Sequence, residues 1–198
     1  MLEVLNQLDT ECFLWINRHH CTALDWVFWT LSPHWFWVVA IVVALGAMTL
    51  RRESRRWWLV GIGIALCFLL ADRGSVVLFK DTVCRLRPCH VLEDVRMFRT
   101  HCGGQYGFVS SHAANAFALV AFFWMRYRRW EGRSRRRALL APAVMLLWAL
   151  ATCYSRAYLG KHYPGDLLGG ALFGTLVGLL VHLIVSTFEK KFQKNETK

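Results

Sequence analysis

The stretch WWLVGIGIALCFLLADRGSVVLF, residues 57–79, decides the fold class of this 198-residue chain. It is long enough to cross the hydrocarbon core of a bilayer, which takes about 20 apolar residues. Its charges, Asp72 and Arg73, lie near its far end. Because lipid offers the backbone no hydrogen-bond partners, a spanning segment must be a helix or part of a closed barrel. No alternation with the period of a strand runs through the sequence, so residues 57–79 are predicted to form a transmembrane helix.

Four further apolar stretches accompany this segment, and the chain is 56% hydrophobic with a positive mean hydropathy. They lie at about residues 35–50, 111–124, 138–154 and 167–188. This content and the chain length predict one all-α domain, a polytopic transmembrane helix bundle with five spans. In the last stretch, glycines repeat every four residues at Gly170, Gly174 and Gly178, which predicts a smooth face for close helix packing.

The N-terminal segment, residues 1–33, is rich in Trp and Phe but also carries Arg18, His19, His20 and Asp25. We interpret it as one or two interfacial helices with the Trp rings at headgroup depth; the alternative is a sixth span. No basic region precedes it, so a cleavable signal peptide is not expected. The domain then comprises an interfacial segment at 1–33, a helical bundle at 34–188 and a cytoplasmic tail at 189–198.

The formal charge of +11 is clustered between the apolar stretches. We therefore interpret it first as a signal of membrane topology and not as a nucleic-acid-binding surface. Most of the Lys and Arg lie in residues 51–56, 126–137 and 189–198, which fall on one side of the membrane. The positive-inside rule makes that side the cytoplasm. The segment KDTVCRLRP, residues 80–88, then lies on the opposite side, where topology disfavours positive charge, and its cations are expected to serve chemistry.

Three segments with unusual polar residues meet on that outer side: residues 80–88, 106–115 and 155–166. Adjacent helices of a small bundle bring their outer ends together, so one pocket at the membrane surface can hold all three. The segments supply cations suited to a tetrahedral oxyanion, and hydroxyls at a helix N-terminus, where free N–H groups also favour an anion. The predicted phosphate-binding residues are Lys80, Arg87, Ser110, Ser111 and Arg156.

Two histidines in the same segments, His112 and His162, are candidates for a nucleophile and a proton donor. Asp166 follows His162 by four residues, at the start of the last predicted helix, where it can hold the His162 ring in one tautomer. Taken singly, the serines could be helix caps, the cations could reach toward lipid headgroups and the aspartate could complement a helix dipole. Their joint occurrence on one predicted side favours a catalytic site.

The order of these residues resembles the type 2 phosphatidic acid phosphatase superfamily, which contains integral membrane lipid phosphatases and the vanadium haloperoxidases. The resemblance covers roughly residues 55–185. It rests on Lys80, Arg87 and Pro88, then Ser110 and His112, then Ser155, Arg156, His162 and Asp166. One motif departs from the family pattern, because Val109 and Ser111 stand where the family usually has Pro and Gly.

The resemblance implies a mechanism. His162 attacks phosphorus and becomes a phospho-histidine, while Asp166 orients and stabilises its ring. His112 protonates the leaving oxygen and then activates the water that hydrolyses the intermediate. Lys80, Arg87 and Arg156 neutralise the phosphoryl oxygens, so no metal and no other cofactor is expected.

Other cations and the seven cysteines leave alternatives open. Arg85, Arg96, Arg99 and Lys161 could extend the positive field toward a second phosphate or a sugar headgroup; the favoured interpretation is a solvated rim. A bridge between Cys89 and Cys102 is favoured among the outer cysteines, although spacing does not establish connectivity. Cys12, Cys21 and Cys84 lie on the same side, whereas Cys67 and Cys153 fall within spans. A zinc site is not expected because no CxxC pair occurs.

The leading functional hypothesis is a phosphatase domain of the inner membrane that hydrolyses a lipid phosphate or diphosphate on the periplasmic or exterior face. Undecaprenyl diphosphate is the first choice of substrate, followed by phosphatidylglycerol phosphate and lipid A phosphates. The expected partners are the bilayer and the lipid substrate, with no nucleic acid and no obligate protein partner. The alternatives are a non-catalytic protein that binds or transports anionic lipids, and a haloperoxidase, which the spans disfavour because that branch is soluble.

Overall fold

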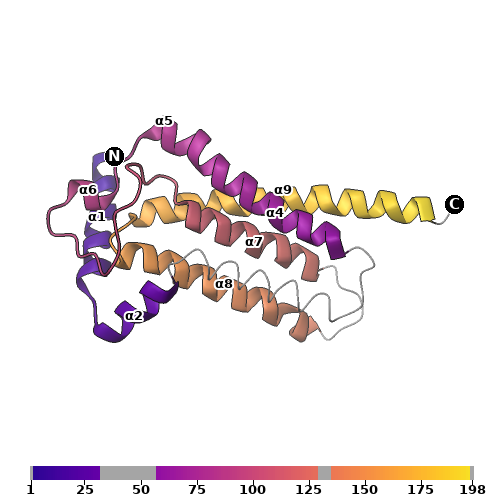
Figure 1. Cartoon of the computed structure of the whole chain (residues 1–198), viewed down its shortest axis with the longest axis horizontal. Helices are drawn as coiled ribbons and strands as arrows, with labels where there is room; N and C mark the ends of the chain where they lie inside the picture. The colour runs from indigo at the N-terminus through magenta and orange to yellow at the C-terminus, as the bar shows by residue number, and fades with distance from the viewer. Residues whose placement is uncertain (1, 32–56, 129–134, 197–198) are drawn as a thin grey trace.

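A computed structural model describes residues 2–31, 57–128 and 135–196 (Figure 1). Within these ranges, two helices open the chain, and four long helices follow, with three short helices between the first two of these four. The helices are α1 (Leu2–Arg18), α2 (Thr22–Leu31), α4 (Trp57–Ser75), the π-helix η1 (Val76–Lys80), α5 (Asp81–Val83), α6 (Pro88–Val91), α7 (Ser111–Arg128), α8 (Arg135–Tyr158) and α9 (Pro164–Glu196). No β-strand forms among these residues, and Leu86 and Tyr106 make an isolated antiparallel bridge. The all-α prediction is confirmed.

Four of the five predicted spans correspond to α4 with η1, α7, α8 and α9. The stretch 35–50 lies outside the described residues. Two of the described helical segments, Trp58–Val83 and Pro164–Lys194, are long and apolar enough to cross a membrane. The predicted number of five spans is therefore not confirmed.

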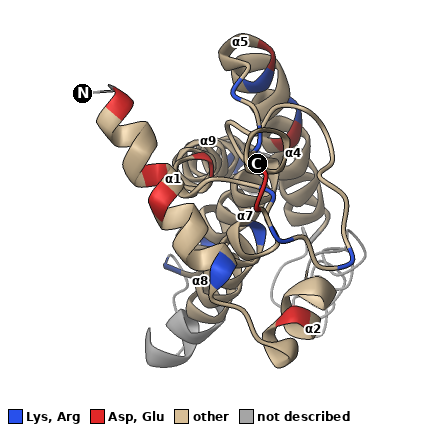
Figure 2. Ribbon diagram, turned by 90° about the vertical axis from the view of Figure 1, so that its left-hand side faces the viewer, with Lys and Arg blue, Asp and Glu red and all other residues tan. Residues whose placement is uncertain are grey.

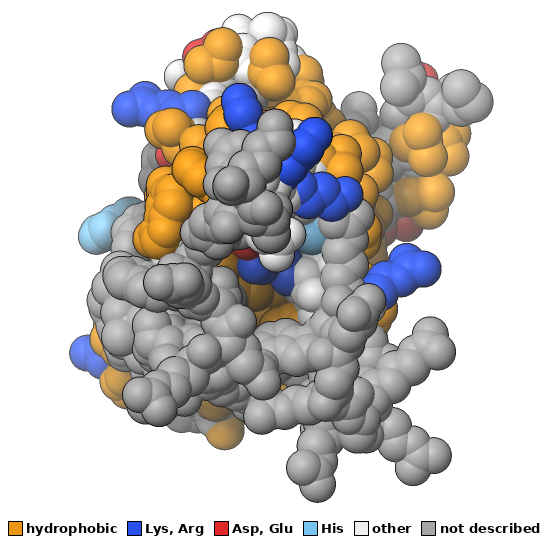
Figure 3. All heavy atoms as spheres, turned by 90° about the vertical axis from the view of Figure 1, so that its right-hand side faces the viewer, with side chains coloured by type: hydrophobic (Ala, Val, Ile, Leu, Met, Phe, Trp, Pro, Cys, Tyr) orange, Lys and Arg blue, Asp and Glu red, His pale blue; other side chains and the backbone are white. Residues whose placement is uncertain are grey.

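The long helices α4, α7, α8 and α9 run alongside one another, and their ends divide between two ends of the molecule (Figure 1). At one end meet the C-terminal ends of α4 and α8 and the N-terminal ends of α7 and α9. At the other end lie exposed cations of α7 and α9, among hydrophobic side chains (Figure 3): Arg128, Lys190, Lys191 and Lys194. The described parts of the predicted cytoplasmic segments thus lie opposite the predicted site.

Glycines bring α9 against α7, as the four-residue spacing predicted. A Cβ atom at Gly170 would lie 2.5 Å from the Ser110 carbonyl oxygen, and one at Gly174 or Gly178 would overlap the backbone of α7. This close packing fixes the position of the α9 N-terminus relative to Ser110 along the helix axis, and so helps to position the site.

The opposite side of α9 is apolar and exposed. Leu168 is 73% exposed, and the exposed leucines recur every four residues along the helix: Leu168, Leu172, Leu176 and Leu180. A continuous exposed apolar stripe of this kind is typical of a surface that faces lipid.

The N-terminal segment forms two helices rather than one long span. α1 has 17 residues and α2 has 10, and residues 19–21 separate them. Figure 2 views the molecule from the end at which both helices lie. Asn17 of α1 donates to the carbonyls of Arg96 and Tyr158, while Asp25 of α2 accepts two bonds from the Arg96 guanidinium. These contacts hold α1 and α2 over the end of the bundle where the predicted site lies.

Candidate active site

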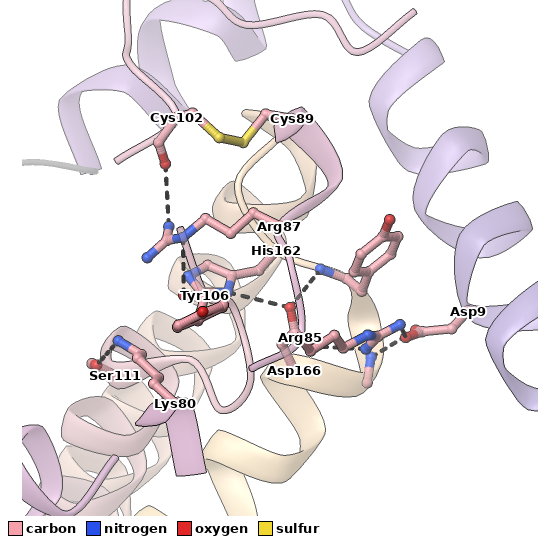
Figure 4. A network of polar contacts seen from close by, with 12 residues as sticks. Asp9, Lys80, Arg85, Arg87, Cys89, Cys102, Tyr106, Ser111, His162 and Asp166 are labelled. Atoms are coloured by element: carbon pink, nitrogen blue, oxygen red, sulfur yellow. Dashed lines mark hydrogen bonds and ion pairs between the residues drawn. A yellow bond between two sulfur atoms is a disulfide. The ribbon is translucent and has the colours of Figure 1, made fainter. Parts of the chain in front are cut away.

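The three predicted segments converge at the end of the bundle covered by α1 (Figure 4). Lys80 ends η1, Ser111 begins α7, and the connection from α8 to α9 carries His162 just before Pro164 begins the last helix. Proline suits the first position of a helix because its fixed φ matches the helix and its missing N–H would have no partner there. Because the three segments converge, residues far apart in the chain share one polar network.

Lys80 is held by a hydroxyl of the neighbouring helix. Its ammonium donates to Ser111 Oγ at 2.7 Å, and Ser111 Oγ also lies 2.6 Å from Ser75 Oγ. The π-helical turn before Lys80 widens the backbone, and such turns occur frequently at functional sites. Ser111 stands where the family that the motifs resemble usually has glycine, so this contact to Lys80 depends on a residue outside that family's pattern.

Arg87 is fixed by the loop that follows it. Its Nη1 donates to the Cys102 carbonyl and its Nε to the Tyr106 carbonyl, both at 3.3 Å. Cys89 and Cys102 form a disulfide with a Cα–Cα distance of 5.8 Å, which confirms the favoured pairing. The bridge holds the carbonyl of Cys102 beside the guanidinium, so the loop presents Arg87 in one direction.

Asp166 lies between His162 and the loop. His162 Nδ1 and Asp166 Oδ2 are 3.4 Å apart, and the two side chains are 2% and 0% exposed. The same oxygen accepts the backbone N–H of Tyr163 at 3.1 Å. Gly107 passes so close that a Cβ atom there would lie 2.7 Å from Asp166 Oδ2. The carboxylate is thus enclosed, and it faces one nitrogen of the His162 ring.

Cations surround the His162 ring. Burial, and then the positive charges of Arg87, Arg156 and Lys80, hold the pKa of His162 well below its usual value. Arg156, in the last turn of α8, is itself 2% exposed. The three predicted cations therefore act on one imidazole, which stays neutral at physiological pH. A neutral imidazole carries the free electron pair that a nucleophile needs.

Lys161 adds a fourth positive group next to the histidine. Burial and the charges of Arg156 and Arg87 lower the pKa of Lys161 to about 8. It is half-buried, in the connection between α8 and α9.

Ser110 and His112 flank Ser111 at the start of α7. The Ser110 N–H donates to the Asp166 carbonyl at 3.0 Å. The Ser110 hydroxyl is fully buried and has no hydrogen-bond partner among the described residues. His112 is half-buried in the first turn of the helix. The structure thus places Ser110 against the residues around His162 and puts His112 in the adjoining turn.

The favoured interpretation of Arg85 and Arg96 as a solvated rim is wrong. Arg85 donates to Asp166 at 2.9 Å and to Asp9 at 2.7 Å, and Arg96 forms its two bonds with Asp25. The two guanidinium groups remain partly exposed, at 23% and 31%, but carboxylates that are at most 14% exposed hold them in place. Arg99 instead lies over the ring of Trp26 at 4.9 Å.

Sequence reasoning did not identify Asp9, Ser75 or Gly107. Asp9 accepts the backbone N–H of Gly165 at 2.7 Å as well as the Arg85 bond. Gly107 lies inside a predicted segment, and a glycine beside an aromatic residue in a catalytic loop could have indicated a close backbone approach. Asp9 and Ser75 belong to no motif, and only the packing of their helices brings them to the site.

This arrangement supplies the groups required for phosphoryl transfer. A neutral imidazole faces a carboxylate through one nitrogen, and its surroundings are cationic. Transfer of a phosphoryl group depends on positioning and on neutralising charge that spreads over its oxygens. The three cations that act on His162 suit that task.

A family model described as PAP2 superfamily matches residues 56–190. Two curated relatives are lipid A 4'-phosphatases. One, from Bacteroides thetaiotaomicron, is 30% identical over 87% of this chain and 74% of the relative. The other, from Porphyromonas gingivalis, is 26% identical over 85% of this chain and 69% of the relative.

One similar solved structure is a transmembrane PAP2-type phosphatidylglycerolphosphate phosphatase from Bacillus subtilis. The two share 22% sequence identity with a TM-score of 0.69, over 95% of this chain and 87% of the solved one. At this identity the likeness concerns the fold.

Proposed function

The chain belongs to the PAP2 superfamily, and from that we propose that it hydrolyses a phosphate from a membrane lipid by way of a phospho-histidine. The observation that carries the proposal is the buried, neutral His162, which faces Asp166 and lies in the field of three cations. A protein that only binds an anion needs the cations but not the histidine and the carboxylate.

His162 is the proposed nucleophile. Its Nδ1 faces Asp166, so Nε2 is the atom that attacks phosphorus. A nitrogen–phosphorus bond forms as the bond from phosphorus to the lipid oxygen breaks. His112 gives its proton to the departing oxygen. It then takes a proton from water, which attacks phosphorus and releases His162 and inorganic phosphate.

Lys80, Arg87 and Arg156 stabilise the phosphoryl oxygens in both steps, together with the hydroxyls of Ser110 and Ser111. Asp166 stabilises the imidazolium character that develops on His162 as phosphorus is transferred. With this much positive charge in place, the reaction is expected to need no metal. Activity should therefore persist in a chelator, and a loss that Mg²⁺ restores would contradict this expectation.

We favour a lipid A phosphate as the substrate. The similarity to a lipid A 4'-phosphatase extends over 87% of the chain, and this observation moves the choice away from undecaprenyl diphosphate. The site lies at the end of the bundle opposite the exposed cations of α7 and α9, which fits a catalytic centre on the outer face of the inner membrane. The exposed leucines of α9 would face the bilayer.

The test measures phosphate release in detergent from lipid A, undecaprenyl diphosphate and phosphatidylglycerol phosphate. Wild-type protein should release phosphate most rapidly from lipid A. His162→Ala should lose at least about 10³-fold in kcat while retaining its affinity for inorganic phosphate, because the cations remain in place. His101→Ala, which alters an exposed histidine of the loop, should match the wild type. If neither the wild type nor His162→Ala releases phosphate while both bind the lipid, the result would favour a lipid-binding protein instead.

A further inference from the structure

An ion-pair chain connects α1 to the carboxylate that faces the proposed nucleophile. Arg85 donates through Nη1 to Asp166 Oδ1 at 2.9 Å and through Nη2 to Asp9 Oδ2 at 2.7 Å (Figure 4). One guanidinium therefore bridges two carboxylates, one on α9 and one on α1. Arg85 is also fixed from its face, because the centre of its guanidinium lies 4.2 Å from the centroid of the Tyr163 ring.

The second oxygen of Asp9 completes the connection. Asp9 Oδ1 accepts the backbone N–H of Gly165 at 2.7 Å, one residue before Asp166. A Cβ atom at Gly165 would lie 2.7 Å from Asp9 Oδ2, so α1 approaches the first turn of α9 closely. Asp9 thus holds both Arg85 and the backbone beside Asp166.

Asp166 divides its two oxygens between these partners. Oδ1 accepts from Arg85, while Oδ2 faces Tyr163 N–H and His162 Nδ1. Because Asp166 is fully buried, its negative charge needs a nearby cation to remain stable. Arg85 supplies that cation from the side away from His162, so the carboxylate plane is fixed with Oδ2 toward the ring.

We propose that Asp9 and Arg85 form a positioning relay that keeps Asp166 charged and directed at His162. The relay rests on the proposed function for its effect on turnover, but its effect on the His162 ring is independent of the substrate. In this proposal both residues act through Asp166 and not by binding the phosphate. Through Asp9, the N-terminal helix α1 then helps to position Asp166 and is not only a cover over the bundle.

A second ion pair offers a matched control. Arg96 and Asp25 join the loop to α2 with bonds of 2.6 and 2.7 Å, and their side chains have no contact with Asp166 in the described structure. Arg96→Gln and Asp25→Asn therefore remove the same chemical groups from the same end of the molecule without touching the relay.

The kinetic test compares Arg85→Gln in two backgrounds. In the wild type it should lower kcat about 10- to 100-fold with KM within about 3-fold, and Arg85→Lys should recover part of the loss. In Asp166→Asn it should change kcat less than about 2-fold, because its effect is already absent. Asp9→Asn should give a smaller loss that does not add to that of Arg85→Gln. Equal losses in both backgrounds, or an equal loss in Arg96→Gln, would overturn the relay.

The second test needs no turnover. Nitrogen NMR of histidine-labelled protein in detergent reports which ring nitrogen of His162 carries the proton, with the signal assigned by its loss in His162→Gln. Wild type should hold the proton on Nδ1, and Arg85→Gln should shift the population toward Nε2, while Arg96→Gln should not. An unchanged tautomer in Arg85→Gln refutes the relay even if the wild type releases no phosphate, a result that by itself would refute only the proposed function.

Discussion

At the scale of single residues, the protonation of two side chains should set the pH dependence of the proposed reaction. Burial and three cations disfavour the charged form of His162, so its neutral form persists to lower pH than that of an ordinary histidine. His162 is neutral above its pKa and protonated below it. A lowered pKa therefore moves the pH at which the nucleophile is lost to more acidic values.

The acid limb of kcat/KM should therefore have its midpoint well below pH 6.5. A pH–rate profile with a soluble lipid phosphate analogue measures it. A midpoint at or above about 6.5, the value of an unperturbed histidine, would mean that the ring is not buried among the cations in the free enzyme.

The charge of Lys161 should make KM depend on pH in the alkaline range. With a pKa of about 8, Lys161 is charged below that pH and loses its charge as the pH rises through it. If it attracts the phosphate, KM should rise between about pH 7.5 and 9, and Lys161→Met should show a higher KM that no longer changes over this range. Lys190→Met, at the opposite end of α9, serves as the control and should behave as the wild type.

At the scale of elements, the site depends on how closely α9 approaches α7. The carbonyl of Ala114 contacts the position that a Cβ atom of Gly174 would occupy, and Gly178 meets Ala118 in the same way. By contrast, a Cβ atom at Gly61 of α4 would meet nothing within 4 Å.

Gly174→Ala should destabilise the protein by about 1–3 kcal/mol, because the added methyl forces the helices apart. Gly61→Ala should be neutral or stabilising by up to about 1 kcal/mol, since alanine favours a helix over glycine. Thermal unfolding in detergent compares the two. Similar midpoints for both variants would mean that α7 and α9 do not pack as described.

At the scale of the whole molecule, one covalent bond limits the freedom of the loop between α5 and α7. Cys89 and Cys102 are 13 residues apart, and a bridge over a loop of about that length contributes about 3 kcal/mol in the chain-entropy account. The same bridge holds the carbonyl that accepts Arg87 Nη1.

Removal of the bridge should therefore affect both stability and substrate binding. Cys89→Ser with Cys102→Ser, or reduction of the wild type, should lower the unfolding temperature and raise KM more than it lowers kcat. Cys12→Ser alters an exposed free cysteine on α1 and should change neither. If reduction leaves KM unaltered, Arg87 is held without the help of the loop.

The chain itself indicated the helices and the chemical groups of the site. Apolar stretches predicted α4, α7, α8 and α9 because hydropathy is a local property, and α7 begins at Ser111, where the predicted stretch begins. The sequence placed Asp166 in the first turn of α9, four residues after His162, and the structure brings the carboxylate to that ring. The bridge between Cys89 and Cys102 was favoured from their place between two motifs.

Only the tertiary structure decided which distant groups meet. The bonds from Asp9 to Arg85 and to Gly165 join residues 76 and 156 positions apart, and no periodicity or motif extends that far. Arg85 was expected in a solvated rim, but a buried carboxylate on another helix makes the ion pair the more stable state. Composition and spacing determine which residues can do chemistry, whereas their partners and directions follow from the packing of helices against one another.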